Sequence, residues 1–351
     1  MTPFDPNAAA RPDSGIFGLP HTETEAALVY LPVPWEATTS YGGGTANGPR
    51  AIFAASRQVD LFDLEIAKPY ETGLFMREPS PLVKVWNDEA RPLARAILDT
   101  AGGVAGNPEL EAALQRVNQL GATLNDWVFA QTADLLNGGK IVAVIGGDHS
   151  VPLGAFAAVA RHNPHFGILH FDAHSDTRNA YEGFVWSHAS IMRNALARIP
   201  EITRLVQVGI RDLCEEELNF CAAEGPRVRT FYDRDLTDRK FSGAPFQRIA
   251  EEIIDALPES VWISFDIDGL DPALCPHTGT PVPGGLSYHE ALAILSRLAR
   301  SGRRIIGFDL NEVAPNPSGE DEWDANVAAR LLYKMSALTL YSQGKATLRV
   351  A

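Results

Sequence analysis

The segment HFDAHSDTR, residues 170–178, carries a marked chemical pattern. Asp172, His174 and Asp176 stand at every second position, directly after an apolar run. On an extended backbone, side chains at alternate positions point to the same face. The spacing therefore predicts that three potential metal ligands converge on one side of a strand end.

Polar residues follow three other apolar runs in the same way. They are Gly146-Gly147-Asp148-His149, Asp266-Ile267-Asp268 and Asp309-Leu310-Asn311-Glu312. In open parallel sheets, sites lie in the crevice beyond the carboxyl ends of the strands. We therefore expect these strand ends to meet in one cleft.

Several carboxylates brought into one cleft would repel each other, and divalent cations would remove that repulsion. Carboxylates combined with imidazoles suit Mn²⁺, and also Ni²⁺, Co²⁺ or Zn²⁺. Six residues form the predicted ligand set: His149, Asp172, His174, Asp176, Asp266 and Asp268. One ion that must also hold a reactive water rarely takes six ligands, so the set predicts two bridged ions.

The apolar and helical patterns in the rest of the sequence indicate the strands and helices that position these residues. Near-continuous apolar runs predict buried strands at 27–35, 140–147, 166–174, 204–212, 259–268 and 303–312. Helical segments are predicted from near Pro49 and at 108–139, 215–225, 245–257 and 287–302. Buried strands that alternate with helices indicate an α/β fold with a parallel sheet covered on both faces.

The chain has 351 residues, of which 45% are hydrophobic and 21% charged, as in a globular enzyme. Residues 1–24 are rich in Pro, Asp and Thr and predict an irregular arm, which could cover the cleft or pack against a neighbouring subunit. With no repeat or break in composition, residues 25–351 are predicted to form one catalytic domain.

The net charge of −14 argues against a nucleic-acid or anionic membrane partner and is compatible with a cationic substrate. The sequence lacks a run of transmembrane length and a basic-then-apolar signal pattern. Cys214, Cys221 and Cys275 are too few and too scattered for a disulfide framework. These features predict a cytoplasmic protein.

Five motifs, in order, resemble those of the ureohydrolases, the arginase and agmatinase superfamily. They are GGDHS (146–150), FDAHSD (171–176), SFDIDGLDP (264–272), TGTPVPGG (278–285) and DLNEVAP (309–315). The resemblance covers residues 27–340. It implies a three-layer α/β/α fold with a central parallel sheet, a binuclear and usually manganese centre, and hydrolysis of a guanidine to urea and an amine.

The resemblance also implies roles for single residues. His149, Asp172, Asp176 and Asp266 resemble the ligands of one ion. Asp172, His174, Asp266 and Asp268 resemble those of the other ion, so that Asp172 and Asp266 bridge.

Asp176 can accept a hydrogen bond from a metal-bound hydroxide and orient its lone pair, and a proton could then pass from Asp176 to the leaving amine. Three catalytic or substrate-binding roles are implied by the resemblance. His188 stands at the position of a loop histidine proposed as a proton shuttle. Glu312 matches a glutamate that pairs with the substrate guanidinium, and Thr280 matches a threonine of the same pocket.

The loop TRNAYEGFVWSH, residues 177–188, departs from the small polar residues with which arginases bind the α-amino and α-carboxylate groups. Its rings, including Trp186, predict a substrate other than arginine. Glu182 is predicted to receive a distal ammonium group, as in agmatine. The rings could instead narrow the pocket for guanidine or a small alkylguanidine, with Ni²⁺ as the metal. Arg178 could bind a substrate carboxylate or form an ion pair.

The favoured hypothesis is an agmatinase-like, binuclear metal-dependent amidinohydrolase, with a guanidine hydrolase as the alternative. A catalytically silent subunit that assembles with an active partner is a further alternative, but such a chain would be expected to lose ligands. The resemblance also implies a homo-oligomer, either a trimer or a hexamer.

Overall fold

The computed structural model describes residues 4–319 and 321–350. Within them, eight strands form one sheet in the order β3-β1-β4-β9-β8-β5-β6-β7, and every neighbouring pair is parallel. The strands are β1 (Leu28–Val33), β3 (Leu74–Met76), β4 (Ile141–Gly146), β5 (Phe166–Phe171), β6 (Ile202–Ile210), β7 (Val228–Tyr232), β8 (Ser260–Asp266) and β9 (Arg304–Asn311). A separate pair joins β2 (Ile66–Ala67) to β10 (Thr347–Leu348).

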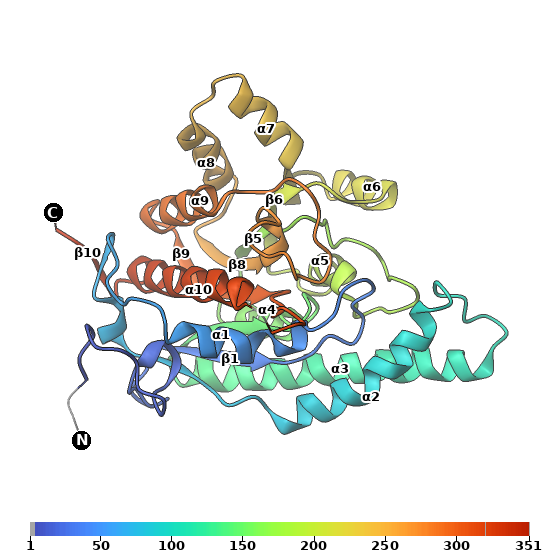
Figure 1. Cartoon of the computed structure of the whole chain (residues 1–351). Coiled ribbons are helices and arrows are strands. Elements are labelled where there is room, and N and C mark those ends of the chain that lie inside the picture. The colour runs from blue at the N-terminus through green and yellow to red at the C-terminus, as the bar shows by residue number, and fades with distance from the viewer. Residues whose placement is uncertain (1–3, 320, 351) are drawn as a thin grey trace.

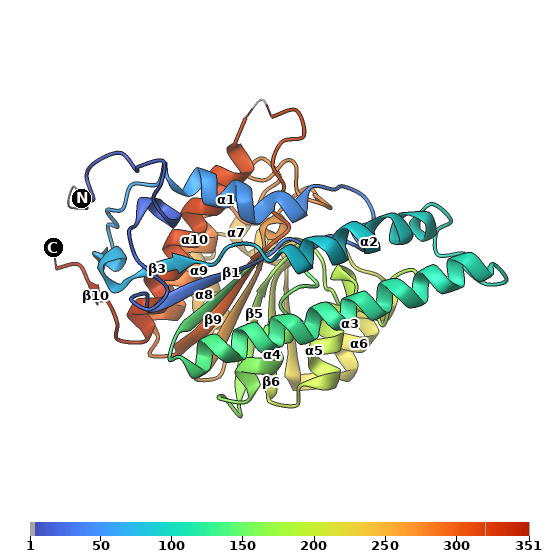
Figure 2. The same ribbon diagram turned by 90° about the horizontal axis from the view of Figure 1, so that it is seen from below.

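Helices cover both faces of the sheet (Figure 1, Figure 2). One layer contains α1 (Gly48–Ser56), α7 (Asp233–Phe241), α8 (Phe246–Asp255), α9 (Tyr288–Arg300) and α10 (Trp323–Ser342). The other contains α2 (Pro81–Leu98), α3 (Pro108–Asn137), α4 (Leu153–Ala160), α5 (Ile191–Arg198) and α6 (Glu215–Ala223). All residues of β1, β4 and β5 are buried as a result, which explains their unbroken apolar sequences.

The predicted three-layer fold is therefore confirmed, together with its six long strands. The short edge strands β3 and β7 were not predicted, nor were helices α2, α4, α5, α7 and α10. Helix α10 is buried on nearly all sides, so its sequence carries only a narrow polar stripe, Asn326, Arg330 and Lys334.

Helices α2 and α3 form a hairpin whose tip projects past the sheet (Figure 1, Figure 2). Each begins with a capping side chain followed by proline: Ser80 accepts a hydrogen bond from the Leu82 amide, and Asn107 from the amides of Glu109 and Leu110. The prediction of a single long helix at 108–139 is confirmed.

Residues 1–3 of the predicted N-terminal arm lie outside the described residues. The rest is mostly irregular and contains a short 3-10 turn, Ile16–Gly18. Phe17 is buried, with its ring 5.0 Å from that of Tyr333 on α10, and its amide donates to Ser56 Oγ on α1. This part of the arm therefore belongs to the core of its own chain.

Among the described residues, the structure contains no helix with the length and apolar character needed to cross a membrane.

Candidate active site

The four central strands β4, β9, β8 and β5 are consecutive in the sheet and parallel, so their carboxyl ends lie at the same edge. Asp266 is the last residue of β8, Asp172 directly follows β5, and Glu312 directly follows β9. His149 lies in the turn after β4. The acidic strand ends therefore meet as predicted.

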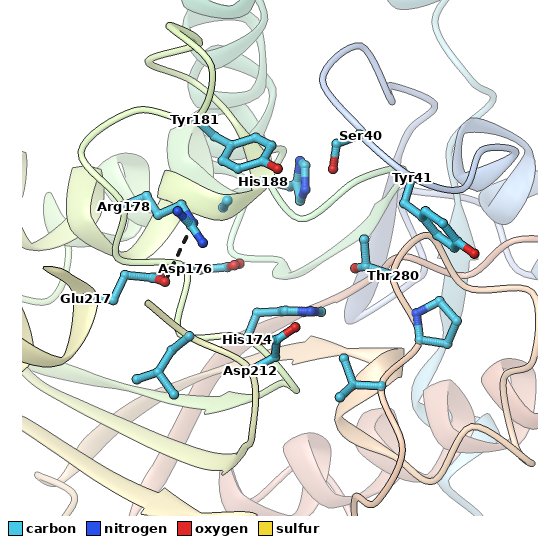
Figure 3. A pocket seen from close by; sticks show the side chains of 14 residues that line it. Ser40, Tyr41, His174, Asp176, Arg178, Tyr181, His188, Asp212, Glu217 and Thr280 are labelled. Atoms are coloured by element: carbon cyan, nitrogen blue, oxygen red, sulfur yellow. Dashed lines mark ion pairs between the residues drawn. The ribbon is translucent and has the colours of Figure 1, made fainter. Parts of the chain in front are cut away.

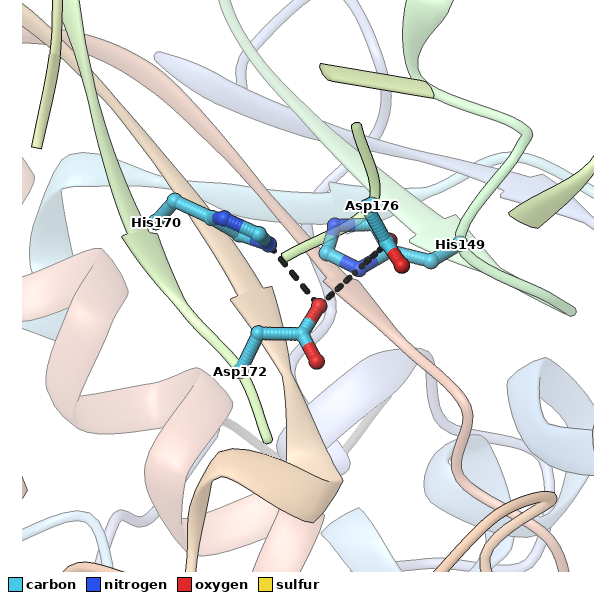
Figure 4. Close-up of side chains that lie close together, drawn as sticks. All are labelled: His149, His170, Asp172 and Asp176. Atoms are coloured by element: carbon cyan, nitrogen blue, oxygen red, sulfur yellow. Dashed lines mark hydrogen bonds and ion pairs between the residues drawn. The ribbon is translucent and has the colours of Figure 1, made fainter. Parts of the chain in front are cut away.

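Three of the predicted ligands surround the imidazole of His149, which is itself a predicted ligand. Its Nδ1 atom is 3.0 Å from Asp172 Oδ2, 3.2 Å from Asp266 Oδ2 and 3.6 Å from Asp176 Oδ2. Figure 4 shows Asp172 and Asp176 reaching His149 from either side. These are the residues assigned to one ion by the family resemblance.

The other oxygen of Asp172 faces a second group. His174 Nδ1 is 3.4 Å from Asp172 Oδ1 and 3.1 Å from Asp268 Oδ2. The side chains of Asp172, His174 and Asp268 form a cluster whose ligand-type atoms lie within 4.8 Å of one another. Asp172 thus stands between the two groups, as a bridging carboxylate would.

The extended geometry predicted for residues 172–176 is wrong, although the side chains do converge. Strand β5 ends at Phe171, and Asp176 has a left-handed backbone with φ 56°. The turn directs Asp172 and Asp176 toward His149, while His174 faces Asp268 on the other side. Alternation along a strand therefore does not account for the cluster.

The charges of this cluster fit divalent cations. Burial, followed by the neighbouring carboxylates, raises the pKa of Asp176 and Asp266 well above the ordinary value. Burial alone would also raise the pKa of Asp172, but His170, His149 and His174 hold it well below its usual value. Bound cations would relieve the repulsion among the carboxylates, as at other buried carboxylate sites.

A hydrogen-bonded chain sets the tautomer of His149. Asp309 Oδ1 lies 2.8 Å from Ser264 Oγ and accepts its only proton, so that Ser264 accepts from His149 Nε2 at 2.8 Å. The lone pair of Nδ1 is left facing the carboxylates. A buried partner that fixes the far nitrogen in this way is typical of histidines that bind metals.

Glu312 reaches the same edge and keeps one oxygen free. Its Oε1 atom accepts a hydrogen bond of 2.9 Å from the His149 amide, while Oε2 is buried without a partner among the described residues. A Cβ atom on Gly279 would lie 2.7 Å from Oε2, so the glycine leaves room for that oxygen. Burial, followed by the charges of Asp266 and Asp148, raises the pKa of Glu312 well above its ordinary value.

A cavity of about 360 Å³ opens beside the cluster (Figure 3). Of the predicted site residues, His174, Asp176, His188 and Thr280 line it. Ser40 and Tyr41, from the connection between β1 and α1, line it too. Thr280 Oγ1 is 3.4 Å from Asp268 Oδ2. Burial, followed by the charge of His174, lowers the pKa of His188 to about 3, so its ring is neutral.

Three residues predicted to bind substrate are not among those that line the cavity: Glu312, whose carboxylate is buried beside the His/Asp cluster, Trp186 and Glu182. Trp186 packs against Gly121 of α3, and the guanidinium of Arg198 lies 4.5 Å from its ring centre. Glu182 packs against Gly102 in the connection between α2 and α3. The side chains of Trp186 and Glu182 occupy the helix side of the 177–188 loop, while Tyr181 faces the cavity.

Arg178 lines the cavity and is partly neutralised. Its Nε atom is 3.6 Å from Glu217 Oε2, and its guanidinium lies 5.1 Å from the centre of the Tyr181 ring. Of the two uses predicted for Arg178, the structure shows the ion pair.

Sequence reasoning missed two residues near the cluster. His170, two positions before Asp172, is fully buried and hydrogen-bonds to it; it continues the alternation of Asp172, His174 and Asp176, and that pattern could have found it. Asp212 lies beside His174, with its amide donating to Ala173, and lines the cavity. It lies two residues after the end of β6, so the rule that sites lie at strand ends could have found it.

Comparisons with known proteins agree with this geometry. A model described as the arginase family matches residues 26–337. N(1)-aminopropylagmatine ureohydrolase of Thermus thermophilus is 34% identical over 310 residues, which is 88% of this chain and 89% of that protein. Agmatinase of Bacillus subtilis is 29% identical over 320 residues, 89% of this chain and 91% of that protein.

A solved structure shares the fold. Proclavaminate amidino hydrolase from Streptomyces clavuligerus superposes with a TM-score of 0.71 at 23% identity, covering 96% of this chain and all of that one. The matches confirm the predicted fold and the prediction that the protein is a hydrolase of the ureohydrolase class. The chain belongs to the arginase family.

Proposed function

We propose that this ureohydrolase releases urea from a guanidine whose tail ends in a protonated amine, as agmatine does. The observation that carries the guanidine part is the unpartnered Glu312 Oε2 atom, buried beside the His/Asp cluster. A guanidinium carries paired N–H groups and a positive charge, which such a carboxylate binds by charge-assisted hydrogen bonds.

Six residues would hold two divalent ions: His149, Asp172, His174, Asp176, Asp266 and Asp268. When bound, two such ions supply the activation of water that hydrolysis at neutral pH requires. The free lone pair on His149 Nδ1 and the crowded carboxylates support this assignment. Mn²⁺ is the first choice by family resemblance, and Ni²⁺ is the alternative.

The side chains of this protein would then carry the substrate and the protons. Glu312 orients the guanidinium, and Thr280 lines the cavity. Asp176 accepts the proton of the attacking water. The C–N bond to the tail breaks when the leaving amine gains a proton, which Asp176 delivers directly or through the neutral imidazole of His188.

The cationic tail is supported by the charges that line the cavity. Arg178 is paired with Glu217, whereas the exposed Asp212 has no ion pair among the described residues. Because the positive charge is paired and a negative charge is not, the cavity disfavours a substrate carboxylate and favours an ammonium group at Asp212. The names of the two relatives at 34% and 29% identity, both acting on agmatine compounds, agree with this choice.

Urea release from agmatine, aminopropylagmatine, arginine, guanidinobutyrate, methylguanidine and guanidine tests the proposal, with Mn²⁺ and Ni²⁺ loaded separately. We expect turnover of one of the amine-tailed compounds. Asp212→Asn should raise KM for that compound by about 10-fold, the loss of one charged contact, and leave methylguanidine unaffected. Glu215→Gln, an exposed charge outside the cavity, is the matched control.

Other outcomes would overturn the proposal in distinct ways. Turnover of guanidine or methylguanidine alone would favour the guanidine hydrolase. No turnover on the whole panel, with both ions bound, would favour a silent assembly subunit. Cytoplasmic location and homo-oligomer formation are part of the same proposal, and the three free cysteines support the first.

A further inference from the structure

His170 contacts the proposed metal centre, although it is not one of the six predicted ligands. It is fully buried on β5, and its Nε2 atom is 2.8 Å from Asp172 Oδ2, the oxygen that also faces His149 (Figure 4). The ligand-type atoms of His149, His170, Asp172 and Asp176 all lie within 4.8 Å of one another. By position alone, His170 could bind a metal ion or hydrogen-bond to a residue that does.

Gln207 on β6 decides between these roles. Its Nε2 atom is 2.8 Å from the backbone oxygen of Ser175, which can only accept, so the amide must present its NH₂ group on this side. Its Oε1 atom accepts from Thr230 Oγ1 at 2.8 Å, which agrees with the same orientation. Both ends of the Gln207 amide are thereby assigned.

The NH₂ group of Gln207 also lies 3.3 Å from His170 Nδ1. Two donors cannot share a hydrogen bond, so Nδ1 must be the unprotonated nitrogen of a neutral ring. The proton of the ring then sits on Nε2 and points at Asp172 Oδ2. No lone pair remains on Nε2 for a metal ion.

His149 has the opposite arrangement. The Asp309–Ser264 chain places its proton on Nε2, away from the carboxylates, and leaves the Nδ1 lone pair facing them. In their neutral forms, two buried histidines whose ring centres are 5.2 Å apart thus turn a lone pair and a proton, respectively, toward the same Asp172 oxygen.

We infer that His170 is a positioning residue and not a metal ligand. It donates from Nε2 to the bridging carboxylate of Asp172, and Gln207 holds it in that tautomer. The bond fixes the rotation of the carboxylate, so that Oδ2 faces the His149 group and Oδ1 faces His174. The inference rests on the proposed metal centre, and loss of such a supporting hydrogen bond typically lowers metal affinity by about 10–100-fold.

Metal binding by the full-length protein tests this without relying on activity. Chelator-treated wild type, His170→Gln, His170→Leu and His149→Gln would be titrated with Co²⁺, recording the number bound, the affinity and the visible absorption bands. His170→Gln keeps an N–H donor near the position of Nε2 and should bind two ions with unchanged bands. His170→Leu should bind about 10–100-fold more weakly, and His149→Gln should lose an ion and change the bands.

The opposite results are equally clear. If His170→Gln loses an ion or changes the bands as His149→Gln does, His170 is a ligand and the inference is wrong. If His170→Leu binds Co²⁺ like the wild type, His170 positions nothing and the inference also fails. Circular dichroism of each variant verifies folding. Gln207→Met removes the residue that holds the His170 tautomer, so this variant should also bind Co²⁺ more weakly than the wild type. Failure of the wild type to take up Co²⁺ would instead overturn the proposed centre itself.

Discussion

Two catalytic candidates share an uncommon backbone conformation. Asp176 has φ 56° and Glu312 has φ 61°, in the left-handed region that residues other than glycine seldom adopt. Such residues typically cost about 1–3 kcal/mol each and occur at functional sites, where the surrounding structure holds them. Here the turns direct both carboxylates toward His149, which a regular strand end would not do.

Glu312→Gln should reduce kcat/KM for every guanidine substrate by about 10²-fold, since charged hydrogen bonds contribute about 1.5–3 kcal/mol. Glutamine can still accept from the His149 amide but lacks the negative charge at the free oxygen. The measurement is steady-state urea release on a tailed and an untailed guanidine, with metal content determined alongside. A loss confined to the tailed compound would show that Glu312 binds the tail and not the guanidinium.

His188→Ala should lower kcat by about 10²-fold, the usual contribution of a proton-transferring group, with little change in KM. Because the ring lines the cavity and its pKa is about 3, it works as a neutral imidazole at physiological pH. Added imidazole should restore part of the rate in a kcat assay. A variant with wild-type kcat would rule out the proton-shuttle role.

The six ligand candidates could be predicted because strand ends in a parallel sheet share an edge, whatever the details of the turns. Gln207 could not, because an isolated polar residue within an apolar strand reveals its partners only when β5 and β6 are paired. His170 stands in phase with Asp172, His174 and Asp176, but its contact with Gln207 depends on that pairing as well. Trp186 misled the prediction because a loop has two sides, and spacing alone does not say which side faces the cavity.

At the scale of elements, the α2–α3 hairpin supports the loop that borders the cavity. Phe184 is fully buried among Ala94, Ile97, Ala113 and Val117 of these helices. Asn118 of α3 adds two hydrogen bonds, donating to the Gly183 carbonyl and accepting from the Val185 amide. The helices therefore hold Tyr181 and Arg178 in place at the cavity wall.

Phe184→Ala should remove this anchor, destabilise the protein by about 3–5 kcal/mol and raise KM for tailed substrates. Metal content should stay near wild type, because the six proposed ligands lie outside the 177–188 loop. Thermal unfolding and KM are the measurements. Phe231→Ala on β7 is the control, since Phe231 is also buried but not among the residues that line the cavity. An equal rise in KM for both variants would contradict the anchoring role.

Long elements were predictable where one local pattern persists over many residues, as in β4, β5 and α3. The short strands β3 and β7 have few residues to reveal a pattern, and they form because longer neighbours offer pairing partners. Helix α10 was missed for a different reason. Its surroundings in the core, and not its own periodicity, determine that it is apolar on nearly all sides.

At the scale of the whole molecule, negative charge favours cations in two ways. The chain carries a net charge of −14, which raises the local concentration of a cationic substrate around the protein. The cluster at the strand ends concentrates several of these negative charges in a buried place. In the metal-free protein, protons bound to these side chains reduce the repulsion that metal ions would otherwise reduce. The stability of the metal-free protein should therefore depend on pH.

The metal-free protein should lose thermal stability as pH rises above about 6.5, the ordinary pKa of histidine. Burial raises the pKa of Asp176, Asp266 and Glu312 in the folded chain, so it binds more protons than the unfolded chain. The pKa values of His149 and His174 are also raised, against the effect of burial, by neighbouring carboxylates, so their stabilising contribution disappears as pH rises through the folded values. Asp172 and His188, whose pKa values are lowered, affect the pH dependence of stability only at more acidic pH.

Metal ions should reverse this trend, because they bind the deprotonated ligands in place of protons. The increase in Tm on adding Mn²⁺ should grow with pH over the same range, as measured by thermal unfolding with and without the ion. Asp176→Asn removes one of the titrating carboxyls, so its metal-free Tm should depend less on pH than that of the wild type. A metal-free wild type whose Tm rises with pH, or an effect of Mn²⁺ that does not change with pH, would show that protons and metal ions do not compete for these residues.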